Sequence, residues 1–305
     1  MEPRTIDIDG PVHCLDYAGP ADGPVFVCVH GLGGSHTNWL SLAPLLAERG
    51  RVLVLDLAGF GRTPLAGRSA SIESNRTLLH RFIERVVGDP VVLVGNSMGG
   101  AISILEAAAH PESVAGLILV DPALPRARGQ EVDRTVVGMF AAYLIPGVGE
   151  WVVQRGLRTL GAEQVSRETL KLCTVDPSRV DPAVVDAQLA LTRERAESMP
   201  WATTALLQAA RSLVRMLARR KWFLTQIKAV RAPTLLLMGR KDRLVPIVAG
   251  EAIALARPDW EFVIFEDIGH VPQLEHPQAT MDAISHWLDG PHADVLRPEE
   301  ASTKT

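Results

Sequence analysis

Six short runs of apolar residues constrain the fold of this chain more than any other feature. Each run is rich in Val, Leu or Ile and shows no polar alternation. A strand that is covered on both faces has this pattern, as in a parallel sheet between two layers of helices. The predicted strands are PVFVCVH (24–30), RVLVLDL (51–57), PVVLVGN (90–96), GLILVD (116–121), PTLLLMG (233–239) and EFVIFED (261–267).

Helical patterns lie between most of these strands, and this alternation predicts a doubly wound α/β sheet with right-handed crossovers. The N-terminal segment differs, because TIDIDG alternates between polar and apolar residues and VHCLDYAGP follows it. This pair predicts an antiparallel hairpin at the edge of the sheet. The helices are predicted at roughly 38–49, 72–87, 98–109, 247–256 and 277–288.

The alternation stops between two of the predicted core strands, where residues 124–230 contain amphipathic patterns and no convincing strand. We expect an inserted helical cap or lid here, because the strand pattern resumes afterwards and needs the earlier strands to close a sheet. A second independent domain is the alternative. The predicted organisation is a core of residues 1–123 and 231–289, a cap of 124–230 and a flexible tail of 290–305. The cap helices are expected near 131–144, 163–173, 182–197 and 201–228.

The bulk properties of the chain exclude several classes of function. The 305 residues carry a formal net charge of −4, which argues against a general nucleic-acid binder. The apolar runs are short or interrupted, so no stable membrane insertion is expected, and the start MEPRTIDIDG has no signal-peptide pattern. The three cysteines form neither a disulfide framework nor a metal motif, which fits free thiols in a reducing cytoplasm.

Ser97 lies at the centre of the motif GNSMG (95–99), which matches G-x-S-x-G. The motif directly follows a predicted strand and directly precedes a predicted helix, which is the structural context that a nucleophile elbow requires. Gly95 and Gly99 leave room for the sharp turn, and the following helix points its positive end at the reacting oxygen. This context predicts that Ser97 is a nucleophile; a merely structural turn is the alternative.

A nucleophilic serine needs a base and an acid that orients the base. Asp242 follows the strand PTLLLMG and His270 follows the strand EFVIFED, so both lie at the edge of the sheet that carries Ser97. We predict that these two residues complete a catalytic triad. Asp121 and Asp267 are rival acids at the ends of other strands. His276 is a rival base, although EHP reads as the entry to the last helix, with Pro277 in its first turn.

Acyl transfer also needs two N–H donors for the developing oxyanion. The Met98 N–H is available as the residue after the nucleophile, and the Leu32 N–H is predicted as the second donor in the glycine-rich loop HGLGGSHTNW. His30 is expected to hold this loop through hydrogen bonds. Phosphate-binding and dinucleotide-binding glycine motifs are absent from the sequence, so neither a cofactor nor a metal is expected.

The cap contains apolar segments that could bind an acyl chain, although the same residues could equally pack the cap's own core. The candidate substrate-binding residues are Met139, Phe140 and Trp201.

Residues 5–289 resemble the α/β-hydrolase superfamily through five motifs in the family's order: HGLGG, DLAGFGRT, GNSMGG, GRKDRLVP and GHVPQLEHP. The resemblance implies an α/β-hydrolase fold with a cofactor-free site beneath a lid. It also implies the triad Ser97, Asp242 and His270.

The identity of the nucleophile narrows the function that this resemblance implies. Epoxide hydrolases and haloalkane dehalogenases carry Asp at the elbow, where this chain has Ser97. GNSM is similar to the elbow of meta-cleavage-product hydrolases, which cut carbon–carbon bonds, but those enzymes usually carry Trp at the positions of Val271 and Leu274. Cofactor-free haloperoxidase-like esterases usually have an aromatic residue where this chain has Leu32.

The remaining interpretation is a carboxylesterase or small lipase that acts on small to medium lipophilic esters. The carbon–carbon hydrolase is the alternative enzyme, and a non-catalytic binding protein on the same fold is the alternative from another class. The expected partner is a small-molecule ester, and the expected state is a monomer or homodimer.

Overall fold

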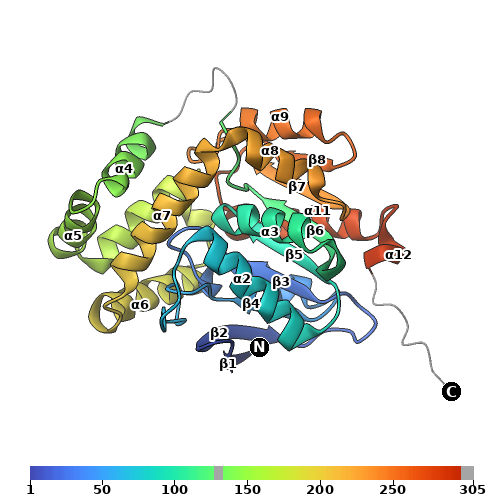
Figure 1. Cartoon of the computed structure of the whole chain (residues 1–305), viewed down its shortest axis with the longest axis horizontal. Helices are drawn as coiled ribbons and strands as arrows, with labels where there is room; N and C mark the ends of the chain where they lie inside the picture. Colours follow the sequence, from blue (N-terminus) through green and yellow to red (C-terminus); the bar gives the residue numbers. More distant parts are fainter. Residues whose placement is uncertain (127–132, 297–305) are drawn as a thin grey trace.

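The computed structural model describes residues 1–126 and 133–296, and the described strands form one eight-stranded sheet (Figure 1). The order across the sheet is β1-β2-β4-β3-β5-β6-β7-β8. Strands β3 to β8 are parallel, whereas β2 is antiparallel to both β1 and β4. The predicted sheet and the N-terminal hairpin are confirmed. The strands are β1 (Glu2–Asp7), β2 (Pro11–Tyr17), β3 (Phe26–Val29), β4 (Val52–Leu55), β5 (Val91–Asn96), β6 (Val114–Val120), β7 (Thr234–Gly239) and β8 (Glu261–Phe265).

The α-helices of the described residues are α1 (Ala43–Leu46), α2 (Ile72–Phe82), α3 (Met98–Ala109), α4 (Arg134–Leu144), α5 (Val148–Cys173), α6 (Pro182–Ser198), α7 (Ala202–Ala218), α8 (Arg220–Ala229), α9 (Ile247–Ala256), α10 (Pro272–Glu275), α11 (Pro277–Leu288) and α12 (Ala293–Leu296). A turn of π-helix, Ile83–Val87, extends α2. Short 3₁₀ helices span His36–Trp39 (η1), Pro111–Ser113 (η3) and Pro177–Arg179 (η4).

The single helix predicted over 38–49 is wrong, because the structure has η1 and α1 in its place. Ser35 caps η1 by accepting a hydrogen bond from the Thr37 N–H. Pro44 stands in the first turn of α1, where its missing N–H costs nothing. In a continuous helix the same proline would remove an interior hydrogen bond and interrupt the helix.

Two layers of helices bury the two faces of the sheet. One face packs against α2, α3, α8 and α9, and its strand residues include Leu93, Leu117 and Leu236. The other face packs against α1, α11 and α12 and includes Val92 and Ile118. Because consecutive strand residues point to opposite faces, each unbroken apolar run supplies both layers at once.

The helices α4 to α8 lie between β6 and β7 in the chain. Figure 1 shows α4, α5 and α6 gathered at one side of the molecule, with α7 running back from them toward the sheet layers. The last of these helices, α8, packs against α3 and buries Phe223 and Ile227 in the main core. The domain boundaries at 123 and 231 stay a prediction.

Within the described ranges, no individual helix has both the length and the apolar composition to cross a membrane. Helices α4 and α5 meet these criteria only as a pair, and they are bent by 119° relative to each other.

Candidate active site

Ser97 occupies the sharp turn between β5 and α3 with a left-handed backbone, φ 52° and ψ −118°. Such a conformation costs a non-glycine residue about 1–3 kcal/mol and persists only where the surrounding structure holds it. The Ser97 N–H donates to the Val120 carbonyl at 3.1 Å, and the Ser97 carbonyl accepts from the N–H groups of Ala101 and Ala123. The turn is therefore anchored from three directions, as expected for a residue that must present its hydroxyl outside the sheet.

The flanking glycines make this turn sterically possible. A Cβ on Gly99 would overlap the backbone carbonyl oxygens of Val29 and His30. A Cβ on Gly95 would lie 2.7 Å from the Cα of Gly100. The G-x-S-x-G spacing thus lets α3 begin directly against the end of β3.

His270 and Asp242 are joined by a hydrogen bond of 2.6 Å between Nδ1 and Oδ2. Both side chains are buried, and they come from the turns that follow β8 and β7. The second oxygen of Asp242, Oδ1, accepts from the backbone N–H groups of Leu244 and Val245. The carboxylate therefore fixes the orientation of the imidazole, and Nε2 is the ring nitrogen left for chemistry.

Asp121 is the rival acid that lies beside this pair. Its Oδ1 accepts from the Gly239 N–H at 2.9 Å, and its fully buried Oδ2 has no hydrogen-bond partner in the part of the chain that the structure describes. Burial and the neighbouring Asp242 carboxylate raise the pKa of Asp121 well above its usual range. Asp121 is therefore easier to protonate than an ordinary aspartate, which makes it a weaker candidate than Asp242 for the anionic partner of His270.

The other two rivals are engaged elsewhere. Lys241 and Arg179 pair with the exposed carboxylate of Asp267 and lower its pKa to about 2. His276 forms the N-cap of α11, where its Nδ1 accepts from the Ala279 N–H. The geometry thus brings Asp242, and neither Asp267 nor His276, together with His270.

The loop that contains Leu32 crosses directly over the elbow. A Cβ on Gly31 would lie 3.0 Å from the Cβ of Ser97, and Leu32 lines the same cavity as Ser97. Met98 is the first residue of α3, so its N–H is one of the unpaired donors at the helix start. Leu32 and Met98 are thus both close to the serine along the chain or across the elbow.

His30 holds this loop through both of its ring nitrogens. Its Nδ1 lies 2.8 Å from the Gly31 carbonyl oxygen, and its Nε2 accepts from the Leu57 N–H at 3.1 Å. An imidazole that donates at one nitrogen and accepts at the other is neutral. Complete burial favours the same form and lowers the pKa of His30 to about 4.

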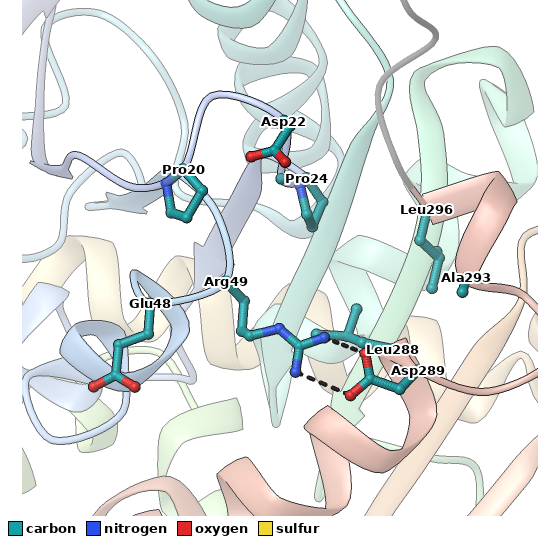
Figure 2. A pocket seen from close by; sticks show the side chains of 10 residues that line it. Pro20, Asp22, Pro24, Glu48, Arg49, Leu288, Asp289, Ala293 and Leu296 are labelled. Carbon is teal, nitrogen blue, oxygen red and sulfur yellow. Dashed lines mark hydrogen bonds and ion pairs between the residues drawn. The ribbon is translucent and has the colours of Figure 1, made fainter.

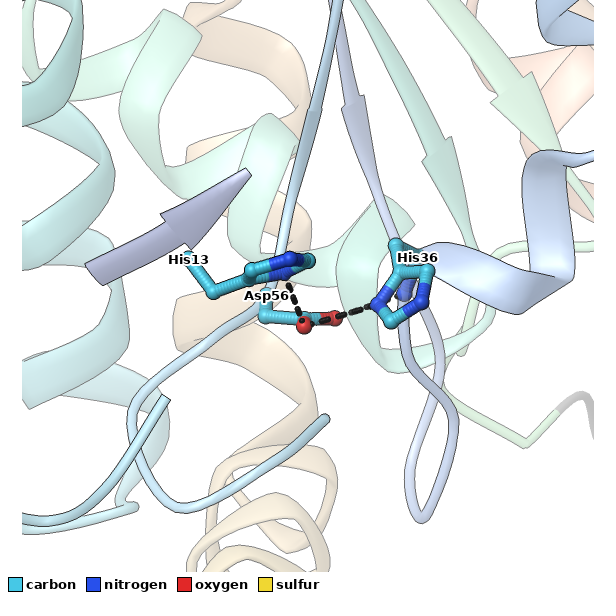
Figure 3. A group of neighbouring side chains, drawn as sticks. All are labelled: His13, His36 and Asp56. Atoms are coloured by element: carbon cyan, nitrogen blue, oxygen red, sulfur yellow. Dashed lines mark hydrogen bonds and ion pairs between the residues drawn. The ribbon is translucent and has the colours of Figure 1, made fainter. Parts of the chain in front are cut away.

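Figure 3 shows a second anchor of the same loop, in which His13 and His36 both point at the Asp56 carboxylate. Each Nδ1 lies 2.8 Å from Oδ2, and the His36 backbone N–H donates to Oδ1 at 2.6 Å. Burial alone would raise the pKa of Asp56, but the hydrogen bonds from the two histidines hold it far below its usual range. The cluster ties β2, η1 and the turn after β4 together.

Glu275 is a buried carboxylate that the sequence did not single out. Its Oε1 accepts from the N–H groups of Val175 and Asp176, and its Oε2 accepts from the Gly269 N–H, each at 2.9 Å. The His270 N–H donates to the Cys173 carbonyl at 2.7 Å. The loop that carries His270 is therefore held by the end of α5 and the residues after it.

Ser97 and His270 open into one cavity of about 810 Å³ between the sheet edge and the helices α4 to α7. Met139 and Phe140 line it, as do Val271 and Leu274. Trp201 is not among its lining residues. It stands at the N-cap of α7. Its neighbours in sequence, Pro200 and Ala202, line the cavity in its stead.

A smaller cavity of about 260 Å³ lies at the opposite edge of the sheet, where β3 and β4 begin (Figure 2). An ion pair between Arg49 and Asp289 crosses it. None of the candidate catalytic residues lines this cavity. Its labelled residues are Pro20, Asp22, Pro24, Glu48, Arg49, Leu288, Asp289, Ala293 and Leu296.

Comparisons with known proteins agree with this architecture. The 2-hydroxy-6-oxo-6-(2'-aminophenyl)hexa-2,4-dienoic acid hydrolase of Metapseudomonas resinovorans is 26% identical over 290 residues, which cover 92% of this chain and 89% of that protein. The pimeloyl-[acyl-carrier protein] methyl ester esterase of Aeromonas hydrophila subsp. hydrophila is 26% identical over 271 residues, 87% of this chain and 96% of that protein.

A solved structure gives the same result for the fold. The crystal structure of a putative lipase from Acinetobacter baumannii superposes with a TM-score of 0.72 at 22% identity, and covers 96% of this chain and 91% of that one. At this identity the likeness concerns the fold alone. The model of the alpha/beta hydrolase family matches residues 26–283. Because this match spans most of the chain, the protein belongs to the alpha/beta hydrolase family and is a hydrolase of that superfamily.

Proposed function

We propose that this hydrolase cleaves carboxylic esters of small to medium lipophilic molecules through an acyl-enzyme. The observation that carries the proposal is the 2.6 Å hydrogen bond between His270 and Asp242. His270 lines the same cavity as Ser97, which stands on a strained turn. Nucleophile, base and orienting acid are thus supplied by three separate strand ends at one edge of the sheet.

In the proposed reaction the Ser97 hydroxyl attacks the ester carbonyl while His270 Nε2 takes its proton. Asp242 stabilises the imidazolium that forms, and the N–H groups of Leu32 and Met98 donate to the oxyanion. His270 then protonates the departing alcohol. A water molecule repeats the sequence on the acyl-enzyme and releases the carboxylic acid, with Ser97 regenerated.

The cavity supports lipophilic substrates of moderate size. Its volume of about 810 Å³ lies within the range of small-molecule sites, and side chains such as Leu32, Phe140, Leu206 and Val271 give it an apolar lining. The proposed chemistry is complete with protein groups and water, so it requires no cofactor.

The test is hydrolysis of 4-nitrophenyl butyrate by the wild type and by Ser97→Ala. We expect the variant to lose at least about 10³-fold in kcat, because the triad acts as a unit. Ser166→Ala is the matched control, since Ser166 lines the same cavity on α5. A fluorophosphonate probe should label the wild type at Ser97 only. An unchanged rate in Ser97→Ala would refute the assignment.

A carbon–carbon hydrolase of the meta-cleavage-product type is the second candidate. Similarity to the dienoic acid hydrolase of Metapseudomonas resinovorans supports it, as does Asn96 beside the nucleophile. Val271 and Leu274, which line the cavity, stand where those enzymes usually carry tryptophan. Turnover of a coloured ring-cleavage dienoate with no hydrolysis of nitrophenyl esters would favour this candidate over the esterase.

A further inference from the structure

Among the described residues, Arg195 is one of two arginines, with Arg158, that line the largely apolar cavity. It comes from α6, lines the cavity, and is half-buried. Its Nη1 donates to the Gly33 carbonyl at 3.0 Å. The guanidinium is thus held against the loop whose Leu32 N–H is the proposed oxyanion donor.

Arg195 forms no ion pair with a carboxylate among residues 1–126 and 133–296, and the Gly33 carbonyl is its one hydrogen-bond acceptor there. A guanidinium has five N–H donors, so most of its binding capacity is unused. The acid next to it in sequence, Glu194, is paired with Arg62. Asp56 attracts it from a distance, but His13, His36 and the Arg62 N–H already bind that carboxylate.

Leaving such a cation uncompensated is unfavourable, because burial removes hydration that a single carbonyl does not replace. Burial lowers the pKa of Arg195, and the Asp56 carboxylate partly opposes this effect. A carboxylate is the group that matches the planar donor fork of arginine, and it carries the opposite charge that neither water nor an apolar side chain supplies.

We propose that Arg195 binds a carboxylate carried by the substrate, so that the enzyme selects amphiphilic esters with one anionic end. This inference rests on the proposed esterase function and names its substrate class. Gly33 directly follows Leu32, so the guanidinium lies within roughly 10 Å of the oxyanion donor along the chain and its hydrogen bond. An acyl chain of moderate length can span that distance.

The test compares esters that differ in one carboxylate. Methyl hydrogen adipate is paired with methyl hexanoate to place the anion on the acyl part, and 3-carboxypropyl hexanoate is paired with butyl hexanoate to place it on the alcohol. The measured quantity is the ratio of kcat/KM for the anionic ester to that for its neutral partner. We expect the wild type to favour the anionic ester in one pair. That pair shows whether Arg195 binds a carboxylate on the acyl part or on the alcohol part of the ester.

Arg195→Gln should lower that ratio by at least about tenfold, mainly through KM, and Arg195→Lys should retain part of it. Arg193→Gln is the matched control, because Arg193 lies on the same helix, is exposed and pairs with Glu163. Its ratio should equal that of the wild type. If Arg195 only holds the loop, Arg195→Gln lowers both rates of a pair equally, and this result overturns the proposal. A wild-type ratio near one in both pairs overturns it as well.

A binding measurement separates this inference from the proposed function. If the folded wild type hydrolyses none of the esters, the esterase proposal fails. Calorimetry of Ser97→Ala with methyl hydrogen adipate and with 3-carboxypropyl hexanoate then decides the anion site independently. Binding of either ester that is lost in the double variant Ser97→Ala/Arg195→Gln supports the site. Equal binding by both variants, or no binding to either, overturns it.

Discussion

At the scale of single residues, the site depends on buried polar groups whose protonation states are fixed by their partners. His30 is neutral because it donates to the Gly31 carbonyl and accepts from the Leu57 N–H while fully buried. Its pKa falls to about 4 in the folded protein, compared with about 6.5 for an unperturbed histidine. The histidine that holds the loop of Leu32 is therefore also a pH-sensitive element of stability.

The sign of this dependence follows from linkage. The unfolded chain binds a proton at this histidine below pH of about 6.5, whereas the folded chain binds it only near pH 4. The stabilising contribution of neutral His30 is complete above the unfolded pKa and is lost as the pH falls through this window, by about 3 kcal/mol at most. Urea unfolding at pH 7.5, 6 and 5 should show this decline in the wild type and a smaller one in His30→Asn.

The exposed His286 provides the control for that measurement. His286→Asn should keep the wild-type dependence of the free energy of unfolding on pH. Parallel curves for the wild type and His30→Asn would contradict the prediction.

The sequence could predict a residue of the site where the pattern that marks it lies close to it in the chain. Ser97, Asp242 and His270 each follow an apolar strand within a few residues, so their place at one sheet edge can be predicted from sequence. Glu275 and Arg195 act through contacts across about 100 and 160 residues, with backbone groups that carry no sequence signal. Trp201 could not be placed from the sequence for a similar reason, because the apolar composition of a segment does not determine which of its side chains line a cavity.

At the scale of elements, the first and last residues of a helix could be predicted where a particular residue in the sequence marks the end of the helical pattern. The ranges 98–109, 247–256 and 277–288 coincide with α3, α9 and α11. By contrast, α5 begins at Val148, far before the expected 163. Its backbone breaks at Gly161, with φ 75° and ψ 165°, and its apolar residues Val148, Trp151 and Leu160 are exposed and form no buried stripe.

The close approach of α3 to β3 gives a prediction for that pair of elements. Gly99→Ala places a methyl group against the backbone oxygens of Val29 and His30, which have no room to move. We expect a loss of about 3 kcal/mol in the free energy of unfolding, measured by denaturant titration. Gly138→Ala on α4 is the matched control, because nothing lies within 4 Å of its added Cβ. Alanine there should be neutral or stabilise the helix by up to about 1 kcal/mol; similar losses for both variants would argue against the steric explanation.

At the scale of the whole molecule, the loop that carries the candidate base His270 follows a strand of the sheet and is held by the inserted helical segment. Glu275 receives two N–H groups from the segment after α5 and one from the loop before His270. It thus joins residues that are about 100 positions apart in the chain, at the point where the imidazole must be held still.

Glu275→Gln tests whether this junction positions His270. The amide can replace one oxygen but turns an NH₂ group toward a backbone N–H, which should cost about 2 kcal/mol of stability. We expect kcat for nitrophenyl butyrate to fall more than the affinity, with a lower melting temperature. Glu266→Gln is the control, because Glu266 lies in the loop between β8 and His270, is exposed, and pairs with Arg240 in the turn after β7. A Glu275→Gln enzyme with wild-type kcat and melting temperature would show that Glu275 does not position His270.

The bond from the His270 N–H to the Cys173 carbonyl has a consequence for protein engineering. A chimera built by exchanging the lid at the ends of β6 and β7 would discard the acceptor that fixes the backbone of the candidate base. Residues 173–176 therefore behave as part of the reaction centre, although they lie in the middle of the exchangeable segment. A lid transplant that keeps these four residues, or supplies an equivalent carbonyl, preserves the reaction centre while changing the walls of the substrate cavity.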